Sequence, residues 1–190
     1  MRNLIGNKWM DASYGKTIDV INPANKVLID TIPNSTLEDV DIAVNEAVVG
    51  QKEWAKVSVH ERGRILLKFA EYVKDDAENL ASLLSQETGK PIKEARAEIG
   101  QVQISVPAFV EQAKHLYGQV IPAGTEIGQD KTIQITERYP IGVVAAIIPF
   151  NFPIDLFGQK VPSALMMGNA VIVKPSLSLI HISEPTRHSL

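Results

Sequence analysis

Cysteine is absent from the 190 residues of the sequence. This absence excludes disulfide bonds and thiolate metal sites, and it excludes a cysteine nucleophile anywhere in the chain. The sequence also lacks a Gly-x-Gly-x-x-Gly phosphate loop, the usual signature of a dinucleotide-binding turn. The acidic run between Glu71 and Glu78 has no histidine at ligand spacing. We therefore predict no metal site.

Blocks of like charge and long apolar segments are missing as well. The net charge of -3 is spread along the chain, so we expect neither nucleic acid nor an anionic membrane as a partner. The longest apolar run is too short to span a bilayer. The first residues also lack the apolar segment of a secretory signal. A cytoplasmic location is predicted.

Hydrophobic residues make up 45% of the chain, enough for the core of one ordinary domain. Two β-rich runs at residues 17–21 and 27–32 flank an Asn-Pro turn and predict a hairpin. Residues 117–129 are rich in glycine and predict a connection. Residues 132–139 then alternate β-branched with polar side chains, which predicts a strand with one covered face.

Helices are predicted over much of the first half of the chain. Their starts are indicated by two capping boxes, Ser35 with Glu38 and Ser58 with Glu61. Gly89 predicts a helix end. From Pro91 to about residue 116, apolar residues recur three and four apart, which predicts a long amphipathic helix.

The most informative stretch is residues 141–153. Residues 142–148 form an apolar run that predicts a buried, parallel strand ended by Pro149. Asn151 follows between two aromatics and two prolines, just past the carboxyl end of the strand, where open α/β sheets bind ligands. Its amide can donate to a developing oxyanion. The alternative is that Asn151 caps the next helix.

A second strand is predicted beside the first. Residues 154–167 favour a helix and residues 170–173 a buried strand, which brings Lys174 to the same sheet edge as Asn151. A lysine at a strand end is either a solvated terminus or a ligand contact.

Four motifs closely resemble the NAD(P)-dependent aldehyde dehydrogenase superfamily in order and spacing. The resemblance runs from the first residues to about Ser176. The motifs are Glu-Thr-Gly-Lys-Pro at 87–91, Pro-Phe-Asn-Phe-Pro at 149–153, Lys-Val-Pro-Ser-Ala-Leu at 160–165 and Gly-Asn-Ala-Val-Ile-Val-Lys-Pro at 168–175.

The resemblance implies an α/β fold, an incomplete Rossmann-like cofactor-binding domain. Residues 1–131 would form its amino-terminal hairpin and scaffold helices, 132–140 a strand of an oligomerisation sheet, and 141–176 the first strands of the cofactor site. Family members use a cysteine that lies beyond these motifs, so we expect an amino-terminal fragment that is inactive alone. Residues 177–190 depart from the family and look like a translated sequencing adapter, so they are expected to be non-native.

The resemblance also implies the site residues. In the family mechanism a thiolate attacks the aldehyde, Asn151 and a backbone N–H hold the resulting oxyanion, and a glutamate-activated water releases the acid. The expected cofactor is NAD or NADP, with Lys174 bonding the adenosine ribose; the Glu that many NAD-using members carry three residues later is replaced by Leu177. The other expected contacts are Ile147, Ile148, Pro149 and Phe150 in the cofactor crevice, and Pro175 and Ser176 on the ribose side.

A small aldehyde is the expected substrate, and the intact protein is expected to be a homodimer or homotetramer. Many relatives have Trp at the position of Phe150. The Phe in this sequence resembles the pattern of lactaldehyde, non-phosphorylating glyceraldehyde-phosphate and semialdehyde dehydrogenases. Two alternatives stay open. One is a CoA-acylating relative, which shares this half of the sequence. The other is a non-catalytic binding or assembly module that uses residues 132–139 for strand pairing.

Overall fold

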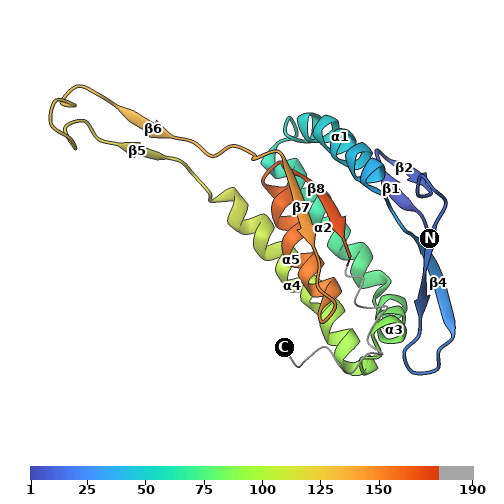
Figure 1. The fold of residues 1–190 in the computed structure, drawn as a ribbon. Helices are drawn as coiled ribbons and strands as arrows, with labels where there is room; N and C mark the ends of the chain where they lie inside the picture. The colour runs from blue at the N-terminus through green and yellow to red at the C-terminus, as the bar shows by residue number, and fades with distance from the viewer. Residues whose placement is uncertain (176–190) are drawn as a thin grey trace, which may run out of the picture.

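The computed structural model describes residues 1–175 and begins with two antiparallel hairpins (Figure 1). The first, which the sequence did not predict, pairs β1 (Asn3–Ile5) with β2 (Lys8–Met10). The second pairs β3 (Thr17–Ile21) with β4 (Leu28–Pro33) and confirms the predicted hairpin. Both hairpins lie beside the helices rather than within the bundle (Figure 1).

Four helices follow the hairpins. They are α1 (Leu37–Trp54), α2 (Val59–Asp75), α3 (Ala77–Thr88) and α4 (Ile92–Lys114). The predicted cap at Ser58 is confirmed, because its side chain accepts the Glu61 N–H. Gly89 ends α3 in the left-handed conformation with φ of 74°, as expected for a glycine at this position.

The first capping box differs from the prediction by one residue. Its members are Thr36 and Asp39, not Ser35 and Glu38. A tertiary contact explains the choice: the backbone N–H and the hydroxyl of Ser13 donate to the Asp39 carboxylate at 3.1 and 2.6 Å. These bonds from Ser13, together with those from Thr36, lower the pKa of Asp39 below its ordinary value.

The segment after α4 forms an arm that projects away from the helices (Figure 1). Its strands β5 (Gln119–Ile121) and β6 (Gln134–Thr136) pair antiparallel. The predicted connection over 117–129 therefore contains a short strand, β5, that the sequence did not predict. The predicted strand over 132–139 is present but shorter.

The last described part is a βαβ unit. Strand β7 (Val143–Ile147) leads through α5 (Pro153–Met166) to β8 (Ala170–Lys174), and the two strands pair parallel as predicted. Helices α1 and α5 both contact this two-stranded sheet.

The core lies mainly between the helices. The largest cluster joins α2, α4 and α5, and two smaller ones lie between α3 and α4 and between α5 and the β7 segment. The largest cluster contains the buried residues Leu66, Ala70, Val102, Val106, Val110 and Met166. No helix in residues 1–175 has the length and apolar character that a membrane crossing requires.

Candidate functional site

The carboxyl ends of β7 and β8 meet at one edge of the sheet, and the predicted site residues lie there. Ile147 pairs in register with Lys174, and the Ile148 N–H donates to the Lys174 carbonyl at 3.0 Å. The chain then bends through Pro149 toward Asn151, which is solvent-exposed and lies before α5. The structure therefore brings the amide and the ammonium to the same sheet edge, as the strand order predicts.

Asn151 does not cap the helix that follows it, so the capping alternative is wrong. The N-cap position is Phe152, and no side chain of the cap residue bonds to the helix. The N–H groups of Ile154 and Asp155 instead donate to the Glu98 carboxylate of α4, at 2.8 and 3.3 Å. A carboxylate also interacts favourably with the positive end of the helix dipole.

Lys90 connects this carboxylate to the turn. Its ammonium group forms an ion pair with Glu98 and donates to the Asn151 carbonyl at 2.9 Å. The ammonium also lies 4.5 Å from the centre of the Phe152 ring, within the range of a cation–π interaction. The side chain of Glu98 is 0% exposed and that of Lys90 is 11% exposed. Neither side chain is among the site residues predicted from the sequence.

Side chains of other helices also form hydrogen bonds with the carboxyl end of α5, and these side chains come from α1 and α2. Three nitrogen donors bond to backbone carbonyls in the last turn of the helix and just after it. The bonds are from Gln51 Nε2 to Gly168 O (3.1 Å), Trp54 Nε1 to Leu165 O (2.7 Å) and Arg62 Nε to Met166 O (3.0 Å). A carboxylate thus lies at one end of α5 and a guanidinium at the other, both with the sign that the helix dipole favours.

Asn169 links the end of α5 to the start of the sheet. Its side-chain oxygen accepts the Gly142 N–H at 3.1 Å, and its side-chain nitrogen donates to the Ala164 carbonyl at 3.1 Å. Gly168 precedes it with φ of 83°, a conformation that favours glycine. These contacts fix where β8 begins and hence where Lys174 emerges.

The other predicted cofactor residues divide into exposed and buried groups. Ile147 and Phe150 are 63% and 46% exposed, and Pro149 and Pro175 are exposed beside them. Ile148 is 3% exposed and packs in the core with Ala146 and Val161, so only its backbone faces the edge. Ser176 lies outside the described residues.

Two further ammonium groups lie at this edge. Lys160 donates from α5 to the Ile147 carbonyl at 2.7 Å, a contact that was not predicted from the sequence. Lys174 is exposed, and its Nζ donates to the Pro175 carbonyl at 3.1 Å. The edge therefore presents positive charge and hydrogen-bond donors, which suit a ligand carrying hydroxyl and phosphate groups.

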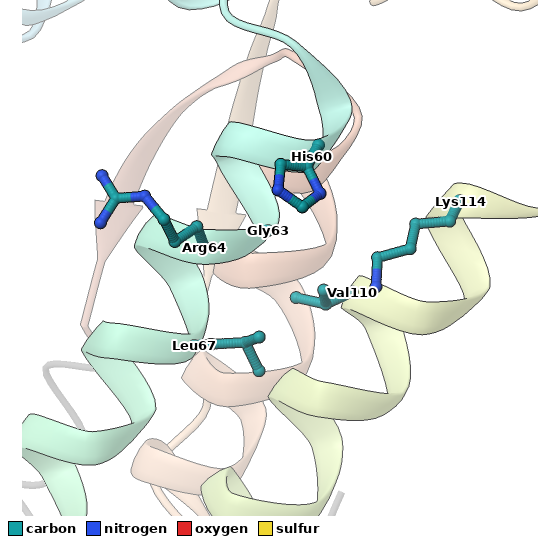
Figure 2. Close-up of a pocket in the computed structure, with 6 residues that line it drawn as sticks. All are labelled: His60, Gly63, Arg64, Leu67, Val110 and Lys114. Carbon is teal, nitrogen blue, oxygen red and sulfur yellow. The ribbon is translucent and has the colours of Figure 1, made fainter.

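A cavity of about 150 Å³ lies away from this edge, between α2 and α4. Figure 2 shows Leu67 and Val110 directed into it from facing helices, whereas Arg64 points away. The lining residues Arg64 and Lys114 are paired with Glu61 and Glu111 on their own helices. Within the described chain, no group of three potential metal ligands comes together.

Fold and site together define a partial α/β domain of the Rossmann-like kind, with its ligand edge at the carboxyl ends of parallel strands. The model of the aldehyde dehydrogenase family matches residues 9–182, and the chain belongs to this family. It spans about a third of the length of the curated relatives that it matches. The described residues accordingly form part of the aldehyde dehydrogenase fold.

Among the relatives is the mitochondrial succinate-semialdehyde dehydrogenase of Oryza sativa subsp. japonica, 36% identical over 92% of this chain and 32% of the relative. Among solved structures is NADP-dependent glyceraldehyde-3-phosphate dehydrogenase from Bacillus halodurans C-125 complexed with NADP. It has a TM-score of 0.89 at 31% identity, over 93% of this chain and 37% of that one. PnpE in complex with nicotinamide adenine dinucleotide has a TM-score of 0.84 at 35% identity, over 92% and 35%.

Proposed function

We propose that this chain supplies the oxyanion donor and part of the cofactor site of an enzyme that oxidises an aldehyde to a carboxylic acid with NAD or NADP. The observation that carries the proposal is the position of Asn151. Its side chain is exposed at the ligand edge of the sheet, while Glu98 satisfies the helix N-terminus that an Asn would otherwise cap. The carboxamide is therefore available to a ligand.

The chemistry of an amide suits this task. When a nucleophile adds to an aldehyde, the carbonyl oxygen gains negative charge, and an N–H donor already held in place stabilises that charge without reorganisation. In the proposed reaction the attacking group is a cysteine thiolate, and a glutamate activates the water that releases the acid. The chain contains no cysteine. We therefore propose that it is inactive alone and that the nucleophile belongs to a part of the protein outside this chain.

The residues of the sheet edge fit a dinucleotide cofactor. Lys174 is an exposed ammonium with donors suited to ribose hydroxyls, and Ile147 and Phe150 offer exposed apolar surface beside it. Pro149, Pro175 and the backbone of Ile148 complete the proposed contact, with Ser176 beyond the described residues. When bound, NAD or NADP accepts the hydride that leaves the substrate carbon.

We also propose that the intact protein assembles through its arm and resides in the cytoplasm. Val120, Ile133 and Ile135 on the arm are between 66% and 72% exposed. Within the described residues β5 and β6 pair only with each other, so the outer edge of each is open to another strand. This arrangement supports a homodimer or homotetramer in which subunits cover the arm.

The test is an assay of the full gene product, meaning the complete protein translated from the gene that encodes this chain. Purified protein is incubated with NAD or NADP and a panel of small aldehydes that includes semialdehydes. The proposal expects reduced cofactor and a carboxylic acid to form in equal amounts. A thioester formed only when coenzyme A is present would identify the acylating alternative. Absence of any cofactor reduction would refute the enzymatic proposal and favour a non-catalytic assembly module.

A further inference from the structure

The turn that carries Asn151 contributes few backbone donors of its own. Pro149 and Pro153 flank it and have no N–H group, so neither can donate a hydrogen bond to close the turn. The turn and the first residues of α5 are instead bonded by side chains from Lys90 and Glu98. Both come from chain that precedes Asn151 by more than 50 residues.

The contacts hold the turn at two points. The Lys90 ammonium donates to the carbonyl of Asn151 itself at 2.9 Å. The Glu98 carboxylate accepts from the N–H groups of Ile154 and Asp155, where the turn enters α5. The ion pair between Lys90 and Glu98 joins these two sets of bonds. The backbone around Asn151 is therefore fixed relative to α4, the longest helix of the described chain.

The burial of the pair distinguishes it from the other ion pairs of the described residues. Its side chains are 11% and 0% exposed, whereas each remaining pair has both partners at least 40% exposed. An exposed pair holds its partners weakly because solvent competes for them. A buried pair whose remaining lone pairs and protons are also hydrogen-bonded holds one geometry.

We propose that Lys90 and Glu98 are positioning residues that set where the Asn151 carboxamide points, and so control oxyanion stabilisation without touching the substrate. This inference rests on the proposed function. A misplacement of about 1 Å at a reacting centre can cost about 10² in rate. Loosening the turn therefore lowers turnover and leaves the cofactor contacts at Lys174 in place.

The experiment measures kcat and the KM for the cofactor in the full gene product. Lys90→Met removes the donor to the Asn151 carbonyl, and the expected result is a fall in kcat of about 10- to 100-fold. The change in the cofactor KM should be much smaller, because Lys174 and Pro175 lie at the end of β8, outside the turn. Lys90→Arg keeps a cationic donor and should recover most of the loss. Arg96→Met is the matched control, because Arg96 lies on α4 in an exposed pair with Glu78. It should leave kcat unchanged.

A double-mutant cycle with Asn151→Ala separates positioning from general damage. If Lys90 acts through Asn151, Lys90→Met causes little further loss once the amide is gone. Should Lys90→Met fail to fold, Glu98→Gln replaces it in the cycle. The Gln amide oxygen still accepts from Ile154 and Asp155, but the ion pair is lost. The same selective fall in kcat is expected.

Three results would overturn the inference: normal kcat in the folded Lys90 or Glu98 variant, an equal loss in Arg96→Met, or a loss that is the same with and without Asn151. These results leave the proposed function standing, provided that Asn151→Ala is itself impaired. Normal turnover of Asn151→Ala would instead refute the proposed role of the amide, and this inference with it.

Discussion

Replacing Arg62 by Met should loosen the carboxyl end of α5, and with it the start of β8. The Arg62 side chain is almost fully buried, with the residue 6% exposed. Its Nε donates to the Met166 carbonyl at 3.0 Å and its Nη1 to the Val57 carbonyl at 2.6 Å. Methionine fills a similar volume but donates no hydrogen bond, so both carbonyls lose their partner.

The size of the effect follows from the bond that reaches α5. Only the bond to the Met166 carbonyl breaks when the helix end opens, because Val57 lies just before α2. A hydrogen bond from a charged donor contributes about 1.5–3 kcal/mol. Part of this contribution is offset, because burying a guanidinium has a desolvation cost; the same burial lowers the pKa of Arg62. We expect a net loss of about 1.4 kcal/mol, which is about tenfold in the equilibrium between the closed and locally opened helix end.

Amide hydrogen exchange of the full gene product, followed by mass spectrometry, measures this opening directly. Peptides covering the end of α5 should exchange about tenfold faster in Arg62→Met. Arg64→Met is the matched control: Arg64 lies on the same helix, exposed and paired with Glu61, and solvent screens an exposed pair so that it holds its partners only weakly. Equal exchange in the two variants would refute the role assigned to Arg62.

Two further predictions concern single side chains, both read from denaturation midpoints of the full gene product. Burial, and to a lesser extent the charge of Asp30, raises the pKa of Glu87 above its ordinary 4.5. Between the pKa of the unfolded chain and the higher pKa of the folded protein, Glu87 is protonated only in the folded state. The free energy of unfolding therefore falls as the pH rises through this interval. Glu87→Gln should stabilise the protein at neutral pH but not below about pH 4, and a gain that does not depend on pH would contradict this. The buried Ser105 hydroxyl has no hydrogen-bond partner among residues 1–175, whereas the Ser85 hydroxyl donates to the Lys90 carbonyl at 2.7 Å. Ser105→Ala should therefore be neutral or stabilising and Ser85→Ala destabilising by about 1 kcal/mol; the reverse order would contradict the assignment.

Elements with a strong local signal could be predicted from the sequence. The β3–β4 hairpin has an Asn-Pro turn between β-rich runs, and the βαβ unit has two apolar runs separated by a helix-length segment. Where two local patterns both fitted the start of a helix, a contact from a residue distant in the sequence determined which one formed. Ser35 with Glu38 and Thr36 with Asp39 both fit a capping box, and the contact from Ser13 selects the second. Short strand β5 was missed because its stability comes from pairing with β6, not from its own sequence.

The site was predicted only in part. The positions of Asn151 and Lys174 follow from strand order, since parallel strands deliver their carboxyl ends to one edge. The residues that hold the site come from other elements, and their partners cannot be read from local sequence. A signal for them does exist. Glu98 lies on the apolar stripe of α4 between Ala95 and Val102, and a charged residue in such a stripe requires a buried partner.

The role proposed for the Asn151 carboxamide is to stabilise negative charge on the former carbonyl oxygen of the substrate. The most direct measurement is kcat for aldehyde oxidation by Asn151→Ala in the full gene product, with the circular dichroism spectrum and cofactor affinity recorded alongside. We predict that kcat falls by about 10² to 10³ while the spectrum and the cofactor affinity stay unchanged. Undiminished turnover in this variant would contradict the account.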